Sequence, residues 1–219
     1  MTVERLLPTA EAYDLPRRRV PHARRNGSAR SAPPEDWGGG GQPYEVYLQV
    51  IEELAARWPA VAVAVSVHVL SCHPLIAFGT AEQQQMWLPD MLGGQSIGAY
   101  SLSEPQAGSD AAALSCKASA VDGGYRISGA KVWITHGGIA DFYSLFPRTS
   151  AGGQGISCFL VDKDTEGLSF GPPEQKMGLH AIPTTTAHYD DSFTQIFEGT
   201  NQIQRLVIGR SLSASGGKR

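Results

Sequence analysis

The chain has 219 residues, enough for one large domain or two small ones. With 42% hydrophobic and 18% charged residues it has a globular composition, and its net charge of −3 favours neither nucleic acid nor an anionic membrane as a partner. Three cysteines without a CxxC pair predict reduced thiols and no metal site. No run reaches the roughly 18 uninterrupted apolar residues of a membrane span, and no apolar secretory core follows Met1, so we expect a cytoplasmic protein.

Residues 1–43 differ in composition from the rest of the chain. Arginine and proline crowd residues 17–34, where large apolar side chains are almost absent. Such a stretch buries too little surface to offset the entropy lost on ordering, so we expect a disordered or degenerate segment. An arginine-rich arm that binds RNA or acidic lipid is the alternative.

Residues 44–97 carry a helical pattern. Apolar residues recur at three- and four-residue steps from Val46 to Leu54, which predicts a helix with one apolar face. The run Val61–Leu70 is apolar nearly all round and predicts a helix buried on most sides. Thr80, followed three residues later by Gln83, fits a capping box at the start of a further helix.

Residues 98–191 shift towards a period of two. Strands are predicted over 125–134 and 155–161, with a turn at Asp122–Gly124 before the first of them. The stretch Gln195–Leu212 returns to helical spacing, within residues 192–219, which we expect to be the remnant of a C-terminal helical domain with a flexible tail. The sequence therefore predicts an α+β fold, in which N-terminal helices pack on a central antiparallel β-barrel or sandwich and a short helix follows.

The run Tyr100–Asp110 contains the first candidate for chemistry. Gly108 and Ser109 follow a predicted strand, and such a loop offers backbone N–H groups and a small hydroxyl to an anionic or carbonyl-rich ligand. A plain Gly-Ser turn is the alternative. Glu104 and Asp110 fit solvated loop carboxylates, and Asp110 also fits the cap of a following helix.

A second candidate is the pair Trp133 and Thr135. Two residues apart on a strand, they are expected to point to the same face. An indole and a hydroxyl on one face could flank a planar ring, one by stacking and the other by hydrogen bonding. The alternative is a tryptophan buried in the core.

Glu198 is the third candidate, within Ile196–Thr200. Apolar neighbours destabilise a charged carboxylate, which raises its pKa and makes it a better proton acceptor. Gly199 leaves room for a ligand beside it. An exposed glutamate that caps the following helix is the alternative reading of the same residues.

Taken in order, Tyr100–Asp110, Trp133–Thr135 and Phe197–Gln202 resemble the acyl-CoA dehydrogenase family, and Pro34–Gly41 and Lys176–Leu179 are similar to it as well. The resemblance implies an FAD-dependent enzyme that dehydrogenates the α,β bond of an acyl-CoA thioester. It also implies electron-transfer flavoprotein as the electron acceptor and a possible homo-oligomer. Residues 98–191 would then be the flavin-binding middle domain.

The resemblance implies roles for individual residues. Glu198 would be the catalytic base, and Ser109 and Gly199 would contact the substrate. Trp133 would pack against the flavin ring, and Thr135 would contact the ring nitrogen that receives hydride. The full set of implied FAD contacts is Tyr100, Leu102, Ser103, Gly108, Ser109, Trp133, Ile134, Thr135, Thr200, Asn201 and Gln202.

The chain departs from the family pattern at one internal step. Asp191 and Glu198 are seven positions apart, where family members continue through a long helical bundle. The sequence therefore predicts a truncated member that lacks most of the N-terminal helical domain and of the C-terminal bundle. A non-catalytic remnant that serves as an interaction module is the alternative function.

Overall fold

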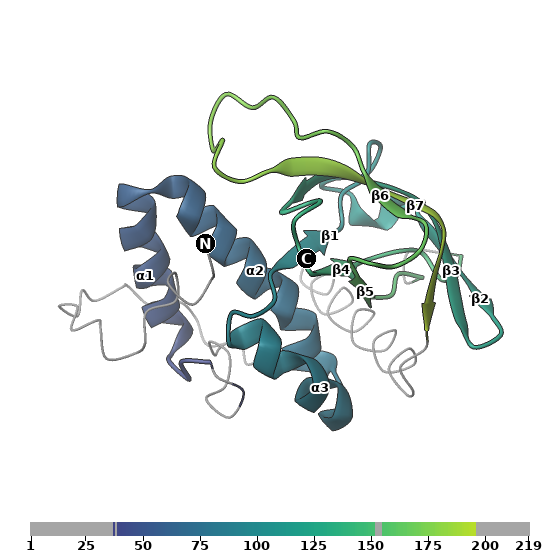
Figure 1. Cartoon of the computed structure of the whole chain (residues 1–219), viewed down its shortest axis with the longest axis horizontal. Coiled ribbons are helices and arrows are strands. Elements are labelled where there is room, and N and C mark those ends of the chain that lie inside the picture. Colours follow the sequence, from purple (N-terminus) through teal and green to yellow (C-terminus); the bar gives the residue numbers. More distant parts are fainter. Residues whose placement is uncertain (1–36, 38, 152–154, 196–219) are drawn as a thin grey trace, which may run out of the picture.

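The computed structural model describes residue 37, residues 39–151 and residues 155–195. In Figure 1 the described α-helices lie on one side of the molecule and the strands on the other. The predicted C-terminal helix and most of the arginine-rich segment lie outside these residues. In chain order the elements are α1 (Tyr44–Arg57), α2 (Pro59–Phe78), α3 (Ala81–Leu92), β1 (Gly98–Ser101), the 3-10 turn η4 (Ala111–Ala113), β2 (Lys117–Val121), β3 (Gly124–Thr135), β4 (Phe142–Leu145), β5 (Phe159–Asp162), β6 (Leu168–Phe170) and β7 (Thr184–Gln195).

Local signals in the sequence set where the helices begin and end. The predicted capping box is confirmed, since the Thr80 hydroxyl accepts from the Gln83 amide at 3.3 Å and the Gln83 side chain accepts from the Thr80 amide at 3.0 Å. Trp58 has a non-helical backbone, with φ −148° and ψ 84°, because it precedes Pro59, so α1 ends and α2 begins there.

Helix α2 is buried or half-buried on most of its sides. Its buried residues include Val65, Cys72 and Leu75, and within Val61–Leu70 only Leu70 is exposed, at 46%. The prediction that this run is buried on most sides is therefore confirmed. By length and composition alone α2 could cross a membrane, a property that core helices of soluble proteins share. The expected absence of a membrane partner stays a prediction.

The strands form two sheets and, within the described residues, no closed barrel. One sheet has the order β1-β4-β5 and the other β2-β3-β7-β6. The second sheet is antiparallel throughout, but β1 and β4 run parallel, so the prediction of a wholly antiparallel domain is wrong. The physical reason is that the β2–β3 hairpin lies between β1 and β4 in the chain and supplies the long connection that a parallel pair needs.

Of two predicted strand features, one is confirmed and the other differs in extent. The turn at Asp122–Gly124 is confirmed: β2 ends at Val121, Gly123 has a φ of +75°, and β3 starts at Gly124. The strand predicted over 155–161 is shorter, because only Phe159–Asp162 pairs along β4.

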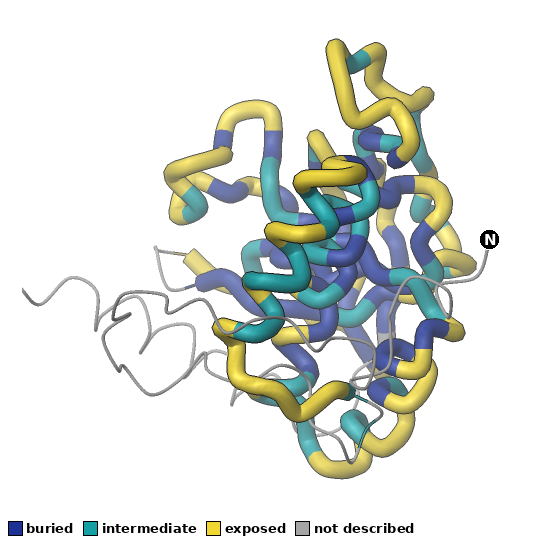
Figure 2. The backbone as a smooth tube through the Cα atoms, turned by 90° about the vertical axis from the view of Figure 1, so that its left-hand side faces the viewer, coloured by how far each residue is buried: buried dark blue, intermediate teal, exposed yellow. Residues whose placement is uncertain are grey.

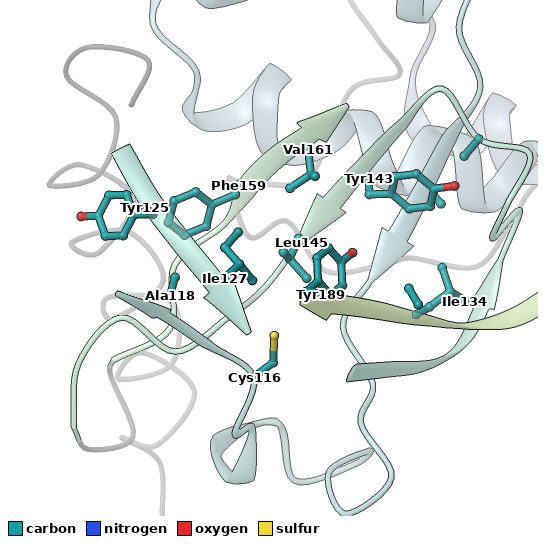
Figure 3. Packing of buried hydrophobic residues seen from close by; sticks show 13 residues of the cluster. Cys116, Ala118, Tyr125, Ile127, Ile134, Tyr143, Leu145, Phe159, Val161 and Tyr189 are labelled. Carbon is teal, nitrogen blue, oxygen red and sulfur yellow. The ribbon is translucent and has the colours of Figure 1, made fainter. Parts of the chain in front are cut away.

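The main core lies between the two sheets (Figure 3). Aromatic pairs join the two layers: Tyr125 of β3 meets Phe159 of β5 with ring centroids 5.1 Å apart, and Tyr143 of β4 meets Phe170 of β6 at the same separation. Tyr189 of β7 is fully buried and hydrogen-bonds Ser101 of β1 at 3.0 Å. The sheets therefore pack face to face as a sandwich.

Helix α2 meets the sheet at Gly98, which is buried. Figure 2 shows the buried segments, in dark blue, running through the middle of the molecule. The Gly98 N–H donates to Nδ1 of His68 at 3.0 Å, so the other ring nitrogen carries the proton and donates to the Met91 carbonyl at 2.9 Å. A Cβ at position 98 would lie 2.1 Å from the Ser71 hydroxyl oxygen and 2.4 Å from the Phe142 ring. Only glycine allows this approach.

Candidate functional site

A buried ion pair joins the run Tyr100–Asp110 to strand β3. Nζ of Lys131 is 2.7 Å from Oε1 of Glu104, and their side chains are 0% and 1% exposed. The prediction of a solvated Glu104 is therefore wrong. Burial alone would raise the pKa of Glu104, but the Lys131 ammonium and the N–H groups of Ser115 and Cys116 outweigh it and hold that pKa below its usual value.

The Lys131 ammonium has three acceptors and so satisfies all its protons. Besides Glu104 it donates to the carbonyl oxygens of Leu102, at 2.9 Å, and Phe146, at 2.7 Å. Leu102 directly follows β1, and Phe146 directly follows β4. The ammonium of a β3 residue therefore joins the carboxyl ends of two parallel strands in the other sheet.

The loop after Glu104 turns tightly and then opens to solvent. Glu104 and Ala107 exchange two backbone hydrogen bonds, at 2.8 and 3.1 Å. Gly108 and Ser109 are exposed, and a Cβ at Gly108 would meet no atom within 4 Å. Asp110 accepts from the Ala112 amide at 3.1 Å and caps η4, which confirms the capping interpretation.

The first part of the run lies against β3. Tyr100 packs on Phe146 with ring centroids 4.8 Å apart, and burial raises its pKa to about 12. Leu102 is half-buried in the same small cluster. The carbonyl of the half-buried Ser103 accepts from the Val132 N–H at 2.8 Å. The two segments that the sequence singled out, 100–110 and 133–135, are thus brought side by side.

Trp133 lies on the surface. It is 64% exposed, so the interpretation as a core tryptophan is wrong. Its φ is +60°, which is rare for an aromatic residue, and it sits where the pairing of β3 with β7 shifts between Lys131 and Ile134. Ile134 is buried beside it and Thr135 is half-buried. The shift in register turns the indole towards solvent while the strand continues inward.

Three residues that sequence reasoning did not single out as functional define the frame of this site. They are Lys131, described above, and two histidines that bond the backbone of Gly98: His68 accepts from its N–H, and His136 donates to its carbonyl. Nδ1 of His136 donates to the Gly98 carbonyl at 2.9 Å, and His136 directly follows Thr135. Burial lowers the pKa of both histidines. Lys131 is far from Glu104 in the sequence, and both histidines are far from Gly98, so no local pattern in the sequence predicts these contacts.

The remaining predicted residues lie outside the described part of the chain. These are the implied base and its neighbours, Glu198, Gly199, Thr200, Asn201 and Gln202. Within residues 39–151 and 155–195, no three His, Cys, Asp or Glu side chains gather as a metal site requires.

Comparison with known proteins identifies the group to which this arrangement belongs. The family model for the acyl-CoA dehydrogenase middle domain matches residues 99–192, and the one for the N-terminal domain of the same family matches residues 2–95. The chain belongs to the acyl-CoA dehydrogenase family. The resemblance seen in the sequence is thereby confirmed.

Individual relatives within the acyl-CoA dehydrogenase family agree. An acyl-CoA dehydrogenase of Bacillus subtilis is 38% identical over 162 residues, which cover 73% of this chain and 43% of the relative. The structure of butyryl-CoA dehydrogenase from Megasphaera elsdenii matches with a TM-score of 0.70 and 35% identity, covering 73% of this chain and 44% of that one. The FAD complex of PigA matches with a TM-score of 0.75 and 27% identity, covering 81% and 48%. The chain thus spans less than half the length of these relatives.

Proposed function

We propose that the chain takes part in FAD-dependent α,β-dehydrogenation of an acyl-CoA thioester. The observation that carries this proposal is the exposed Trp133. A tryptophan that is 64% exposed, held at a φ of +60° beside a loop that is open at Gly108, offers a flat aromatic face to a planar ligand. Family membership, and an FAD complex among the similar structures, support flavin as that ligand.

The described residues fit the flavin. Trp133 would lie against the ring system, and Thr135 and Ser103, both half-buried, have hydroxyls with which to bond the ring edge. Gly108 and Ser109 would bind the pyrophosphate, because their exposed loop offers N–H groups without a side chain at Gly108 to block the approach. Tyr100, Leu102 and Ile134 would add further contacts to the cofactor, as the family resemblance implies.

In the proposed reaction Glu198 accepts the α-proton of the thioester on a carboxylate oxygen. Its backbone N–H would donate to the thioester carbonyl and so stabilise the negative charge that develops there. The bound flavin supplies the acceptor for the β-hydrogen, which leaves as hydride. Thr200, Asn201 and Gln202 would add polar contacts to the cofactor, and Gly199 would leave room for the acyl chain.

Family membership supports two further proposals. The substrate is an acyl-CoA, and electron-transfer flavoprotein, the subject of one similar structure, takes the electrons onward. A homo-oligomer would cover apolar side chains such as Leu48 and Leu70, which are 48% and 46% exposed on α1 and α2.

Flavin binding is the first test of the proposed function. We expect the purified full chain to bind added FAD and show its absorbance bands. Anaerobic addition of an acyl-CoA should then bleach them. Glu198→Gln should keep the colour and lose the bleaching, because the amide cannot accept the α-proton. A wild-type protein that does not bind FAD would overturn the proposal.

A non-catalytic module of the same fold is the second candidate. The short step between Asp191 and Glu198, where family members continue through a long helical bundle, favours it. It predicts protein that is folded but colourless, or coloured protein that no acyl-CoA bleaches. Circular dichroism and a thermal unfolding curve on the same sample distinguish a folded module from a misfolded enzyme.

A further inference from the structure

We propose that Lys131 and Glu104 are positioning residues, which fix the separation between the two walls of the flavin site. One wall is the segment 100–103 and the other is the segment 133–135. The inference rests on the proposed function, since it concerns the same site. It assigns a role to two residues that touch neither flavin nor substrate.

The contacts of Lys131 show how one side chain controls three segments. Its ammonium binds the carbonyl of Leu102, the carbonyl of Phe146 and the carboxylate of Glu104, all between 2.7 and 2.9 Å. These acceptors come from the end of β1, the end of β4 and the turn after β1. An ammonium with three acceptors has no spare proton, so moving any one segment breaks a charge-assisted hydrogen bond.

Glu104 extends the same control over the loop. Its carboxylate accepts from the amide of Ser115 at 2.7 Å, the hydroxyl of Ser115 at 2.9 Å and the amide of Cys116 at 3.0 Å, besides Gln106 at 2.7 Å. The exposed residues Gly108 and Ser109 lie between these anchors. Both ends of the loop proposed to bind pyrophosphate are therefore held by one carboxylate.

The position of Lys131 in β3 links this anchor to Trp133. The register of β3 against β7 shifts directly after Lys131, and Trp133 has its positive φ within that shift. Val132, between them, donates to the Ser103 carbonyl at 2.8 Å. The ammonium therefore fixes β3 at the last regular residue before the indole turns outward.

The energetics of buried pairs point to positioning rather than stability. Replacing a buried ion pair by neutral groups of similar volume is often neutral or stabilising, whereas removing one partner leaves a buried charge unpaired. Stability alone therefore gives no reason for a lysine and a glutamate here. The directional bonds to Leu102 and Phe146 are what a neutral pair would lose.

The experiment compares a single and a double variant of the full chain. Lys131→Met should be destabilised because Glu104 is left unpaired, and it should bind FAD weakly. The double variant Lys131→Met, Glu104→Gln should be more stable than the single variant, because no buried charge is left unpaired, but should keep an FAD dissociation constant at least about tenfold above wild type, from the lost charge-assisted bonds. Lys163→Met is the matched control, since it removes the exposed bridge to Asp141 at 2.9 Å and should change neither property.

Two readouts separate positioning from a merely structural role. The resolved shoulders of the visible flavin bands, which report a well-ordered ring, should be lost in the double variant although it unfolds cooperatively and at a higher temperature than the single variant. Hydrogen exchange at the Val132 amide should be about tenfold faster in the double variant than in wild type, with or without FAD. A double variant with wild-type affinity, spectrum and Val132 protection would overturn the proposal. If wild type binds no FAD, the proposed function fails, and the exchange rate of Val132 still decides the positioning role.

Discussion

The junction at Gly98 and the surface around Trp133 are opposite kinds of structure. At Gly98 every backbone group is bonded, the neighbours leave no space for a Cβ, and both flanking histidines are buried. Around Trp133 the indole is mostly exposed, and Gly108 has open space beside it. The difference teaches that different residues determine stability and ligand binding. Substitutions at Gly98 should therefore change stability, and substitutions at Trp133 should change binding.

Gly98→Ala should have the largest effect on stability. Its Cβ would be placed 2.1 Å from the Ser71 hydroxyl oxygen and 2.4 Å from the Phe142 ring. Overpacking of this kind costs about 3 kcal/mol of unfolding free energy. Urea denaturation measures the loss, and Gly108→Ala is the matched control, because its Cβ meets nothing and stability should stay unchanged. Equal stabilities for the two variants would remove the contrast between the two regions.

Acid should weaken the junction before it affects the exposed site. Burial lowers the pKa of His68, and the nearby His136 lowers it further. Above about pH 6.5 the ring is neutral in both states; below it the unfolded chain binds a proton that the folded chain does not. Stability should therefore fall by about 1.4 kcal/mol per pH unit for this one histidine until the pH passes its folded pKa.

Urea denaturation at a series of pH values from 7.5 to about 5 tests this dependence. In His68→Gln the slope should be shallower, with the contribution of His136 left in place. An equally steep slope in that variant would assign the acid sensitivity to other groups.

Thr80→Ala should have a smaller effect, confined to the start of α3. It removes the hydroxyl that accepts from the Gln83 amide and should cost about 1 kcal/mol. Thr80→Ser keeps that acceptor and should retain most of the stability. Chemical denaturation compares the two, and an equal loss in both would show that the methyl group rather than the cap matters.

Trp133→Ala should have the smallest effect on stability and a large one on binding. Because the indole is mostly exposed, the unfolding free energy should change by less than about 0.5 kcal/mol. FAD affinity, measured by quenching of flavin fluorescence, should fall sharply. Trp58→Ala is the control, since that residue is 52% exposed far along the chain, between α1 and α2, and should leave the affinity unchanged. Equal affinities in the two variants would contradict the role of Trp133.

Local features of this protein could be predicted from its sequence, and long-range ones could not. The Thr80 cap and the Asp122–Gly124 turn depend on neighbours within three residues, and both are confirmed. The pair of Glu104 and Lys131 joins residues 27 positions apart, and a lone glutamate in a loop carries no sign of its partner. The parallel β1–β4 pair likewise depends on how the chain crosses over, which periodicity does not record.

The candidate site divides in the same way. Tyr100–Asp110 and Trp133–Thr135 could be identified from residue types in order, and the structure brings them side by side through the Val132–Ser103 hydrogen bond. The exposure of Trp133 could not be identified, because it depends on a register shift between two strands. The alternation of apolar and polar residues along a strand does not predict where the register of its pairing shifts.

Gly98 has a practical consequence for recombining this chain with its relatives. The match to the N-terminal domain of the family ends at residue 95, and the match to the middle domain begins at residue 99. The natural point for exchanging domains therefore lies beside Gly98. Yet its amide is bonded to His68 in the helical part and its carbonyl to His136 in the sheet part. A chimaera joined before Gly98 takes the two partners of the His68 contact from different parents, and one joined after Gly98 does the same to the His136 contact. Exchanges should therefore carry α2, β1 and the turn after β3 together.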